Sequence, residues 1–69
     1  MMNQDLIIDA IIQERMRQDL LHVWTNKTNR LAVLVEEVGE IAQALQGEGS
    51  LEEELVQLSA LCVRWLEEL

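Results

Sequence analysis

The chain has 69 residues and a formal net charge of −8, from 13 acids against 5 bases. A chain this short forms one domain, residues 1–69, and its small core usually needs help from a disulfide, a metal or a partner chain. Cys62 is the only cysteine, so a disulfide within one chain is excluded and a metal or oligomerisation remains. The acidic balance argues against nucleic acid and anionic membranes as partners.

The composition favours an all-α fold. Hydrophobic residues make up 49% of the chain, while Phe, Tyr and Pro are absent, and this mixture suits helices. No apolar run is long enough to cross a bilayer, and the N-terminal acids do not fit a secretory signal. We therefore expect a cytoplasmic protein, in which a lone thiol stays reduced.

The first predicted helix runs from about Gln4 to about Val23, with Asn3 as its N-cap. Apolar residues recur along it at helical spacing and form one stripe, made of Ile8, Ile11, Ile12, Met16, Leu20 and Val23. The polar segment 24–29 breaks the pattern and is predicted to be a short loop, whose last residues cap the next helix.

The second predicted helix runs from about Arg30 to Gln46 and ends at Gly47 and Gly49, because glycine accepts the left-handed conformation past a helix end. Its main apolar stripe, expected to face the core, consists of Leu31, Leu34, Val35, Val38, Ile41, Ala42 and Leu45. The short glycine-containing connection predicts that this helix packs antiparallel to the next one.

The third predicted helix begins after Ser50, which is expected to cap it together with Glu53 in a capping box. Its main stripe consists of Leu51, Leu55, Leu58, Cys62, Trp65 and Leu66. Both later helices also carry apolar residues off these stripes, namely Val33, Ala44, Val56 and Val63. A lone three-helix domain would expose them, so we expect a homodimer or homotetramer that completes an antiparallel helical bundle.

The second helix carries a cluster of acids at Glu36, Glu37 and Glu40, and no Lys or Arg lies between Leu31 and Gln46. Glu37 and Glu40 are three residues apart and share one face of the helix. Glu37 also lies beside apolar positions, so its carboxylate is expected to be partly buried and to need a counter-charge.

Glu54 and Gln57 flank the stripe of the third helix and face Glu37 and Glu40 if the two helices are antiparallel. Three carboxylates and an amide oxygen would then converge between two helices, which is how bundle enzymes build carboxylate metal sites. Such oxygen ligands suit Mg²⁺. On spacing alone, a solvated acidic face explains the same residues equally well.

These residues also resemble a known family. Glu37-x-x-Glu40, followed after 13 residues by Glu54-x-x-Gln57, resembles the ExxE…ExxD signature of MazG-type nucleoside triphosphate pyrophosphohydrolases. Segment 34–45, which contains the first pair, is similar to the family's helix-two segment, and segments 14–18 with Trp24 and 53–67 are similar to short phage and integron-cassette members. The resemblance therefore covers nearly the whole chain.

The resemblance implies Mg²⁺-dependent hydrolysis of normal or modified (deoxy)nucleoside triphosphates to monophosphate and pyrophosphate, with Mn²⁺ as the alternative metal. It implies dimers or tetramers whose active sites involve more than one chain. By position, the metal ligands would be Glu37, Glu40, Glu54 and Gln57. Glu36 and Glu37 would be the catalytic residues, with Glu36 either a ligand or the group that positions the attacking water.

Two departures from the family pattern favour another interpretation. Gln57 stands where the motif usually has Asp, and an amide brings no charge to a cation. Many members also continue into a fourth helix beyond the position of Leu69, which would supply substrate contacts. The alternative function is therefore a catalytically weak or inactive helical oligomer that binds a nucleotide or another protein.

Further substrate contacts are less specific. Trp24 could stack on a base, and Lys27 and Asn29 could contact phosphates, although a polar capping loop with an anchoring aromatic explains all three. Arg15 and Arg17 are expected on a solvated or intersubunit face, with a phosphate contact as the alternative.

Overall fold

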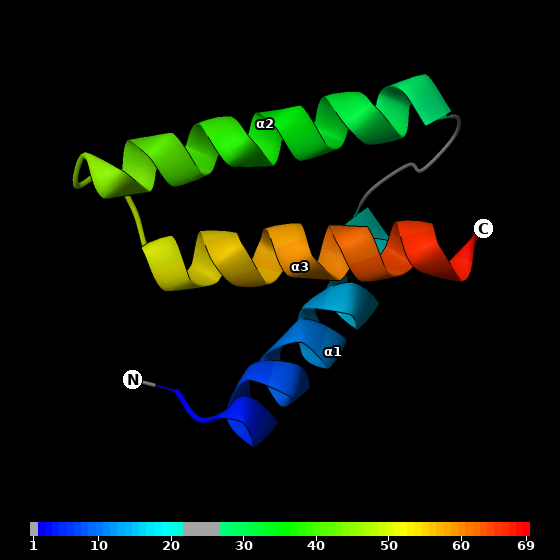
Figure 1. Ribbon diagram of the computed structural model, residues 1–69, viewed down its shortest axis with the longest axis horizontal. Coiled ribbons are helices and arrows are strands. Elements are labelled where there is room, and N and C mark those ends of the chain that lie inside the picture. Colours follow the sequence, from blue (N-terminus) through cyan, green and yellow to red (C-terminus); the bar gives the residue numbers. More distant parts are fainter. Residues whose placement is uncertain (1, 22–26) are drawn as a thin grey trace.

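A computed structural model of the chain describes residues 2–21 and 27–69, and three helices occupy most of those two ranges (Figure 1). The helices are α1 (Gln4–Leu21), α2 (Lys27–Leu45) and α3 (Leu51–Glu67). No strand is present in the described residues, so the all-α prediction is confirmed. None of the three helices is both long and apolar enough to cross a membrane.

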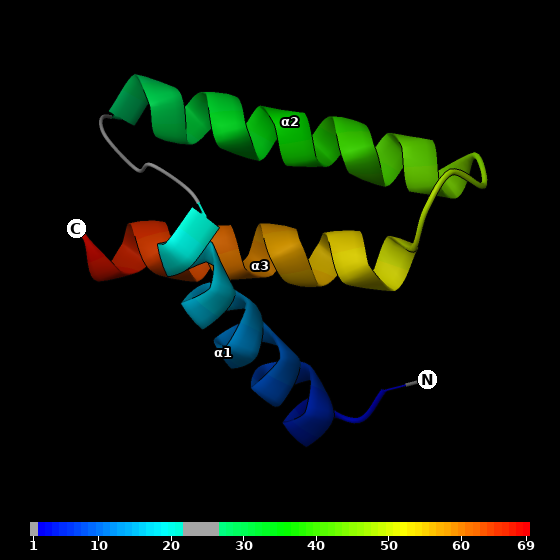
Figure 2. The same cartoon turned by 180° about the vertical axis from the view of Figure 1, so that it is seen from behind.

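α3 is the central helix of this arrangement. α2 lies beside α3 and runs antiparallel to it, whereas α1 crosses α3 obliquely, behind it in Figure 1 and in front of it in Figure 2. Within the described residues α1 and α2 each pack against α3, and they make no close contact with each other. The two outer helices therefore meet different sides of α3, and one broad side of the α2–α3 pair is left without α1.

Local interactions define the helix ends. Asn3 Oδ1 accepts a hydrogen bond of 2.9 Å from a main-chain N–H in the first turn of α1, and Ser50 Oγ accepts one of 3.3 Å at the start of α3. Both predicted N-caps are confirmed. Gly47 and Gly49, between α2 and α3, have φ angles of 93° and 113°, a region that glycine enters without a steric penalty. This turn reverses the chain and makes the two helices antiparallel.

The start of α2 differs from its predicted position. α2 begins at Lys27, so the prediction that segment 27–29 belongs to the loop was wrong. Polar residues suit a first helical turn, because its main-chain N–H groups have no partner within the helix and polar side chains can stay solvated there. α1 ends at Leu21, and Val23, the predicted last residue of the first helix, lies outside the described residues.

The main difference from the prediction is the side of α2 that faces α3. Leu31, Val35 and Val38, predicted to be in the core, are more than half exposed. Val33 and Ala44, predicted to be surplus surface, are half-buried. The residues of α2 that are half-buried are Arg30, Val33, Leu34, Glu37, Ile41 and Ala44. The predicted stripe is thus rotated by roughly one residue, or about 100°, from the contact face.

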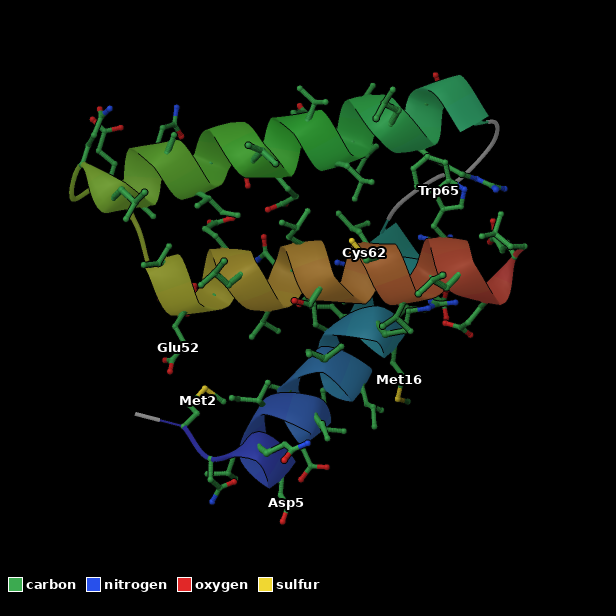
Figure 3. All side chains as sticks on the ribbon, in the orientation of Figure 1. Met2, Asp5, Met16, Glu52, Cys62 and Trp65 are labelled. Carbon is green, nitrogen blue, oxygen red and sulfur yellow. The ribbon has the colours of Figure 1, made fainter. Side chains whose placement is uncertain are left out.

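α3 is better buried than α2, but the core of a single chain is small. Among the described residues, Ala60 and Leu61 are the fully buried apolar side chains. Trp65 is half-buried and points from α3 toward α2, whereas Glu52 points from α3 away from α2 (Figure 3). Most of the predicted α3 stripe is exposed instead, at Leu51, Leu55, Cys62 and Leu66. The fully buried apolar core of the described residues is therefore confined to two side chains of α3.

Polar groups hold α1 against α3. The Gln18 amide is buried and donates to the main-chain oxygen of Gln57 at 3.0 Å, and Arg64 Nη1 donates to the main-chain oxygen of Gln18 at 3.3 Å. Arg15 Nε forms an ion pair with Glu67 at 2.6 Å. These contacts attach the second half of α1 beside Gln57, one of the predicted site residues.

Candidate metal centre

Three carboxylates converge between α2 and α3. Oxygen atoms of Glu37, Glu40 and Glu54 all lie within 4.8 Å of one another. Glu37 and Glu40 come from successive turns of α2, and Glu54 comes from the first turn of α3, which the glycine turn brings alongside. Glu37 and Glu54 are half-buried, whereas Glu40 is exposed. The cluster therefore has an inner pair of carboxylates and an outer one that is open to solvent.

Gln57 bridges the inner pair. With its amide nitrogen facing the carboxylates, Gln57 donates to Glu54 Oε2 and to Glu37 Oε1, each at 3.2 Å. The opposite orientation would place the amide oxygen of Gln57 against these acceptors. The hydrogen-bond network therefore determines that the amide nitrogen faces the two carboxylates. The four positions that the sequence pattern selected thus lie together, with Gln57 acting as a donor to two of the carboxylates.

Glu37 is the most perturbed group of the cluster. Burial, reinforced by Glu54 and Glu40, raises the pKa of Glu37 to about 8. Glu37 Oε2 is buried and accepts no hydrogen bond from the described part of the chain. A buried carboxylate oxygen beside two other carboxylates suits either a proton or a cation, since both relieve the repulsion among the acids. The all-oxygen donor set fits a hard divalent ion such as Mg²⁺ or Mn²⁺.

The other predicted site residues are placed differently. Glu36 is exposed on α2, and its carboxylate is not part of the converging group. Lys27 and Asn29 lie in the first turn of α2. Asn29 is exposed, and it has an interaction partner within the chain. Trp24 lies outside the described residues. The structure therefore brings together the predicted metal ligands but not Glu36.

A groove that Gln57 lines adds residues outside the predicted set of metal ligands. It has a volume of about 560 Å³ and lies between α1 and α3, with Glu14, Arg17, Val56 and Gln57 in its lining. Arg17 donates to both oxygens of Glu14, at 2.7 Å each. These hydrogen bonds raise the pKa of Arg17, and the nearby Glu37 adds to the effect. Gln57 lines this groove and also donates to the carboxylate cluster, so the groove and the cluster are neighbours.

The packing of α1 could not have been read from spacing alone. Glu14 and Arg17 are three residues apart, which signals a local ion pair, but nothing in the sequence places that pair next to Gln57. Comparisons with models of known protein families, with curated proteins and with solved structures give no match to this chain.

The perturbed pKa of Glu37 predicts how stability and metal binding change with pH. The carboxyl ionises above about pH 4.5 in the unfolded chain but keeps its proton to about pH 8 in the folded one. The unfolded state therefore binds fewer protons in this window, and the free energy of unfolding should fall as pH rises from 4.5 to 8. Urea unfolding followed by circular dichroism in EDTA, at fixed protein concentration, measures this effect.

Two controls make the pH prediction specific. Glu37→Gln should flatten the decline, because glutamine does not titrate, whereas the exposed Glu48→Gln should leave it unchanged. Mg²⁺ should restore more stability at pH 8 than at pH 6, since a cation and the Glu37 proton compete for the same oxygens. A decline that persists in the Glu37 variant would assign the titration to another group.

Proposed function

We propose that this chain is a divalent-metal-dependent hydrolase of nucleoside triphosphates that releases pyrophosphate, of the MazG type that its sequence resembles. The observation that carries the proposal is the convergence of Glu37, Glu40 and Glu54 within 4.8 Å, bridged by Gln57. A solvated acidic face does not require carboxylates from two helices to approach this closely. It also does not require one carboxylate oxygen, Glu37 Oε2, to be buried and to accept no hydrogen bond in the described part of the chain.

Each member of the site has a proposed role. Glu37, Glu40 and Glu54 hold the cation. Gln57 supplies a fourth oxygen ligand after its side-chain amide flips, because the flip exchanges the positions of the amide nitrogen and oxygen, which are nearly equal in size. The bound ion would neutralise the triphosphate, polarise the scissile phosphorus and activate water. Glu36, one turn before Glu40 and exposed, orients the attacking water from the solvent side.

The proposed reaction cleaves the bond between the α- and β-phosphates of the nucleotide. Water forms a new bond to the α-phosphorus, the bond to the bridging oxygen breaks, and pyrophosphate leaves with that oxygen. Arg17 lines the groove, and its guanidinium would bind the phosphates of the substrate after its hydrogen bonds to Glu14 break. A nucleotide substrate and a single thiol both fit a cytoplasmic protein.

The direct test is pyrophosphate release over a panel of normal and modified ribo- and deoxynucleoside triphosphates. Turnover is expected with Mg²⁺ or Mn²⁺, and EDTA should abolish it. The nucleoside monophosphate should appear in equal amount, which separates this reaction from stepwise removal of single phosphates. If protein with the helical circular dichroism of a folded chain turns over none of the nucleotides, the proposed activity is wrong.

Gln57 motivates a second candidate function. Because its amide donates to Glu37 and Glu54, the inner part of the site is satisfied without a fourth carboxylate. Such a site could bind a metal–nucleotide complex without hydrolysing it. Calorimetric titration with Mg²⁺ and a non-hydrolysable nucleoside triphosphate distinguishes the cases. Metal-dependent binding without turnover supports the binding module, and an absence of binding refutes both functions.

A further inference from the structure

Gln18 on α1 has a buried side-chain amide that the proposed reaction does not use. Its relative exposure is 1%, and its Nε2 donates to the main-chain oxygen of Gln57 at 3.0 Å. We propose that Gln18 is a positioning residue, which fixes the rotation of α1 about its own axis and so holds Arg17 in the groove that Gln57 lines. This role rests on the proposed function only in so far as Arg17 binds the phosphates of the substrate.

Apolar contacts alone do not determine how α1 is turned. Successive residues are about 100° apart around a helix axis, so Leu6, Ile7 and Ile8 spread over roughly 200° of the circumference. All three are exposed, and so is Ile12. Turning α1 would therefore exchange one set of apolar side chains against α3 for another of similar size, with little change in hydrophobic stabilisation. A directional contact is needed to select one rotation.

The Gln18 amide supplies a directional contact that stability alone does not explain. Its Oε1 is also buried and accepts no hydrogen bond within the described residues. A buried acceptor without a partner destabilises a fold, whereas an apolar side chain of the same size does not. A hydrogen bond has a preferred length and direction, so the amide selects one placement of α1 over others of similar apolar burial.

The other polar contacts between α1 and α3 are less selective. Arg15 pairs with Glu67, whose side chain is 52% exposed, and ion pairs near the surface contribute little to stability. Arg64 donates to the main-chain oxygen of Gln18 at 3.3 Å, but its long side chain can follow that oxygen as α1 turns. The Gln18 amide is shorter and enclosed, so its bond to Gln57 fits only the observed rotation.

The rotation of α1 determines where Arg17 lies. Arg17 is adjacent to Gln18 and Glu14 is one helical turn before it, so both move with it when the helix turns. Arg17 is the only base among the described residues that line the groove. Gln57 accepts the bond from Gln18 with its main chain and bridges two site carboxylates with its side chain. One residue of α3 therefore links the position of Arg17 to that of the carboxylate cluster.

Gln18→Met separates positioning from stability. Methionine has a similar length but no N–H to donate, and it leaves no buried oxygen without a partner. Thermal unfolding should show a stability equal to or above that of the unaltered chain, while the NOEs between α1 and α3 should change. Val56 lines one groove with Ala10 and another with Ile11, so we expect NOEs among their methyl groups in the unaltered chain. In the variant these should weaken, and NOEs from other α1 methyl groups to Val56 should appear.

Gln4→Met is the matched control, because it makes the same change at an exposed position of α1 and should leave the NOEs unaltered. A folded Gln18→Met variant with the NOEs of the unaltered chain overturns the proposal. A second measurement uses the unaltered chain and does not depend on how a variant folds. The side-chain amide protons of Gln18 should exchange slowly with solvent and give NOEs to α3. Exchange as fast as that of Gln4 also overturns the proposal.

Calorimetric titration with inorganic tripolyphosphate in Mg²⁺ tests the effect on the groove. Arg17→Met should weaken binding by about 10-fold or more, as expected when a charged hydrogen-bonding group is lost. Gln18→Met should also weaken it, and the double variant should bind no more weakly than Arg17→Met, because Gln18 acts through Arg17. Losses that simply add contradict this role. The NOEs and amide exchange need no nucleotide, so they decide the role of Gln18 even if the chain hydrolyses none.

Discussion

Replacing Glu40 with glutamine is expected to lower pyrophosphate release on the order of 10²- to 10³-fold, the loss typical of removing one group that stabilises the transition state. Glutamine keeps the size of the side chain but removes one of the three carboxylates that we propose hold the cation. Glu40 is exposed, so the substitution should leave the fold intact. The rate should be measured at saturating nucleotide over a range of Mg²⁺ concentrations.

Glu48→Gln is the matched control for this experiment. Glu48 is an exposed acid in the turn between α2 and α3, so its replacement changes the net charge equally without touching the converging carboxylates. This variant should retain full activity. If Glu40→Gln keeps the rate of the unaltered chain at every Mg²⁺ concentration, the catalytic metal is not held where we propose.

Leu61→Ala is expected to cause the largest loss of stability of any single apolar truncation in the described residues. Leu61 is 1% exposed and lies on α3, the helix against which α1 and α2 both pack. Burying an alanine in its place leaves a cavity, and such substitutions cost about 2–5 kcal/mol. A small domain has a total stability of roughly 0.05–0.15 kcal/mol per residue, so the loss is comparable with the whole. Thermal unfolding followed by circular dichroism should lose its cooperative transition or shift steeply downward.

Leu20→Ala provides the comparison for Leu61→Ala. The Leu20 side chain is 86% exposed on α1, so truncating it removes the same atoms from a solvated position. The free energy of unfolding of the Leu20→Ala variant should stay within about 0.5 kcal/mol of that of the unaltered chain. Equal losses at the two positions would show that α3 does not form the core of the fold. Protein concentration must be held constant, because an associating chain has a concentration-dependent stability.

The sequence predicted the helices well because their ends are locally encoded. Asn3 and Ser50 cap helices through hydrogen bonds within four residues, and Gly47 and Gly49 supply the left-handed turn. The contact face of α2 was not predictable in the same way. Both sides of α2 are apolar, so periodicity alone cannot choose between Val33 and Val35. The choice depends on which side fits α3, and that is a property of the folded pair.

The candidate site was predictable to the extent that it is local. Glu37 and Glu40 share a helix face by spacing, and the short turn puts Glu54 opposite them. The Gln57 amide orientation and the high pKa of Glu37 depend on distances between helices, which spacing does not give. The position of Glu14 and Arg17 depends on how α1 crosses α3. The motif spacing therefore predicted which carboxylates converge, whereas the position of the groove depends on the angle at which α1 crosses α3.

The central position of α3 has a consequence for the order of folding. All four site residues lie in the segment 37–57, inside a helical hairpin closed by a short turn. By contrast, α1 reaches α3 through contacts such as that between Gln18 and Gln57, which are 39 residues apart in sequence. Local contacts close smaller loops and form faster. The carboxylates thus belong to the part of the chain that can assemble first, and the groove is completed only when α1 arrives.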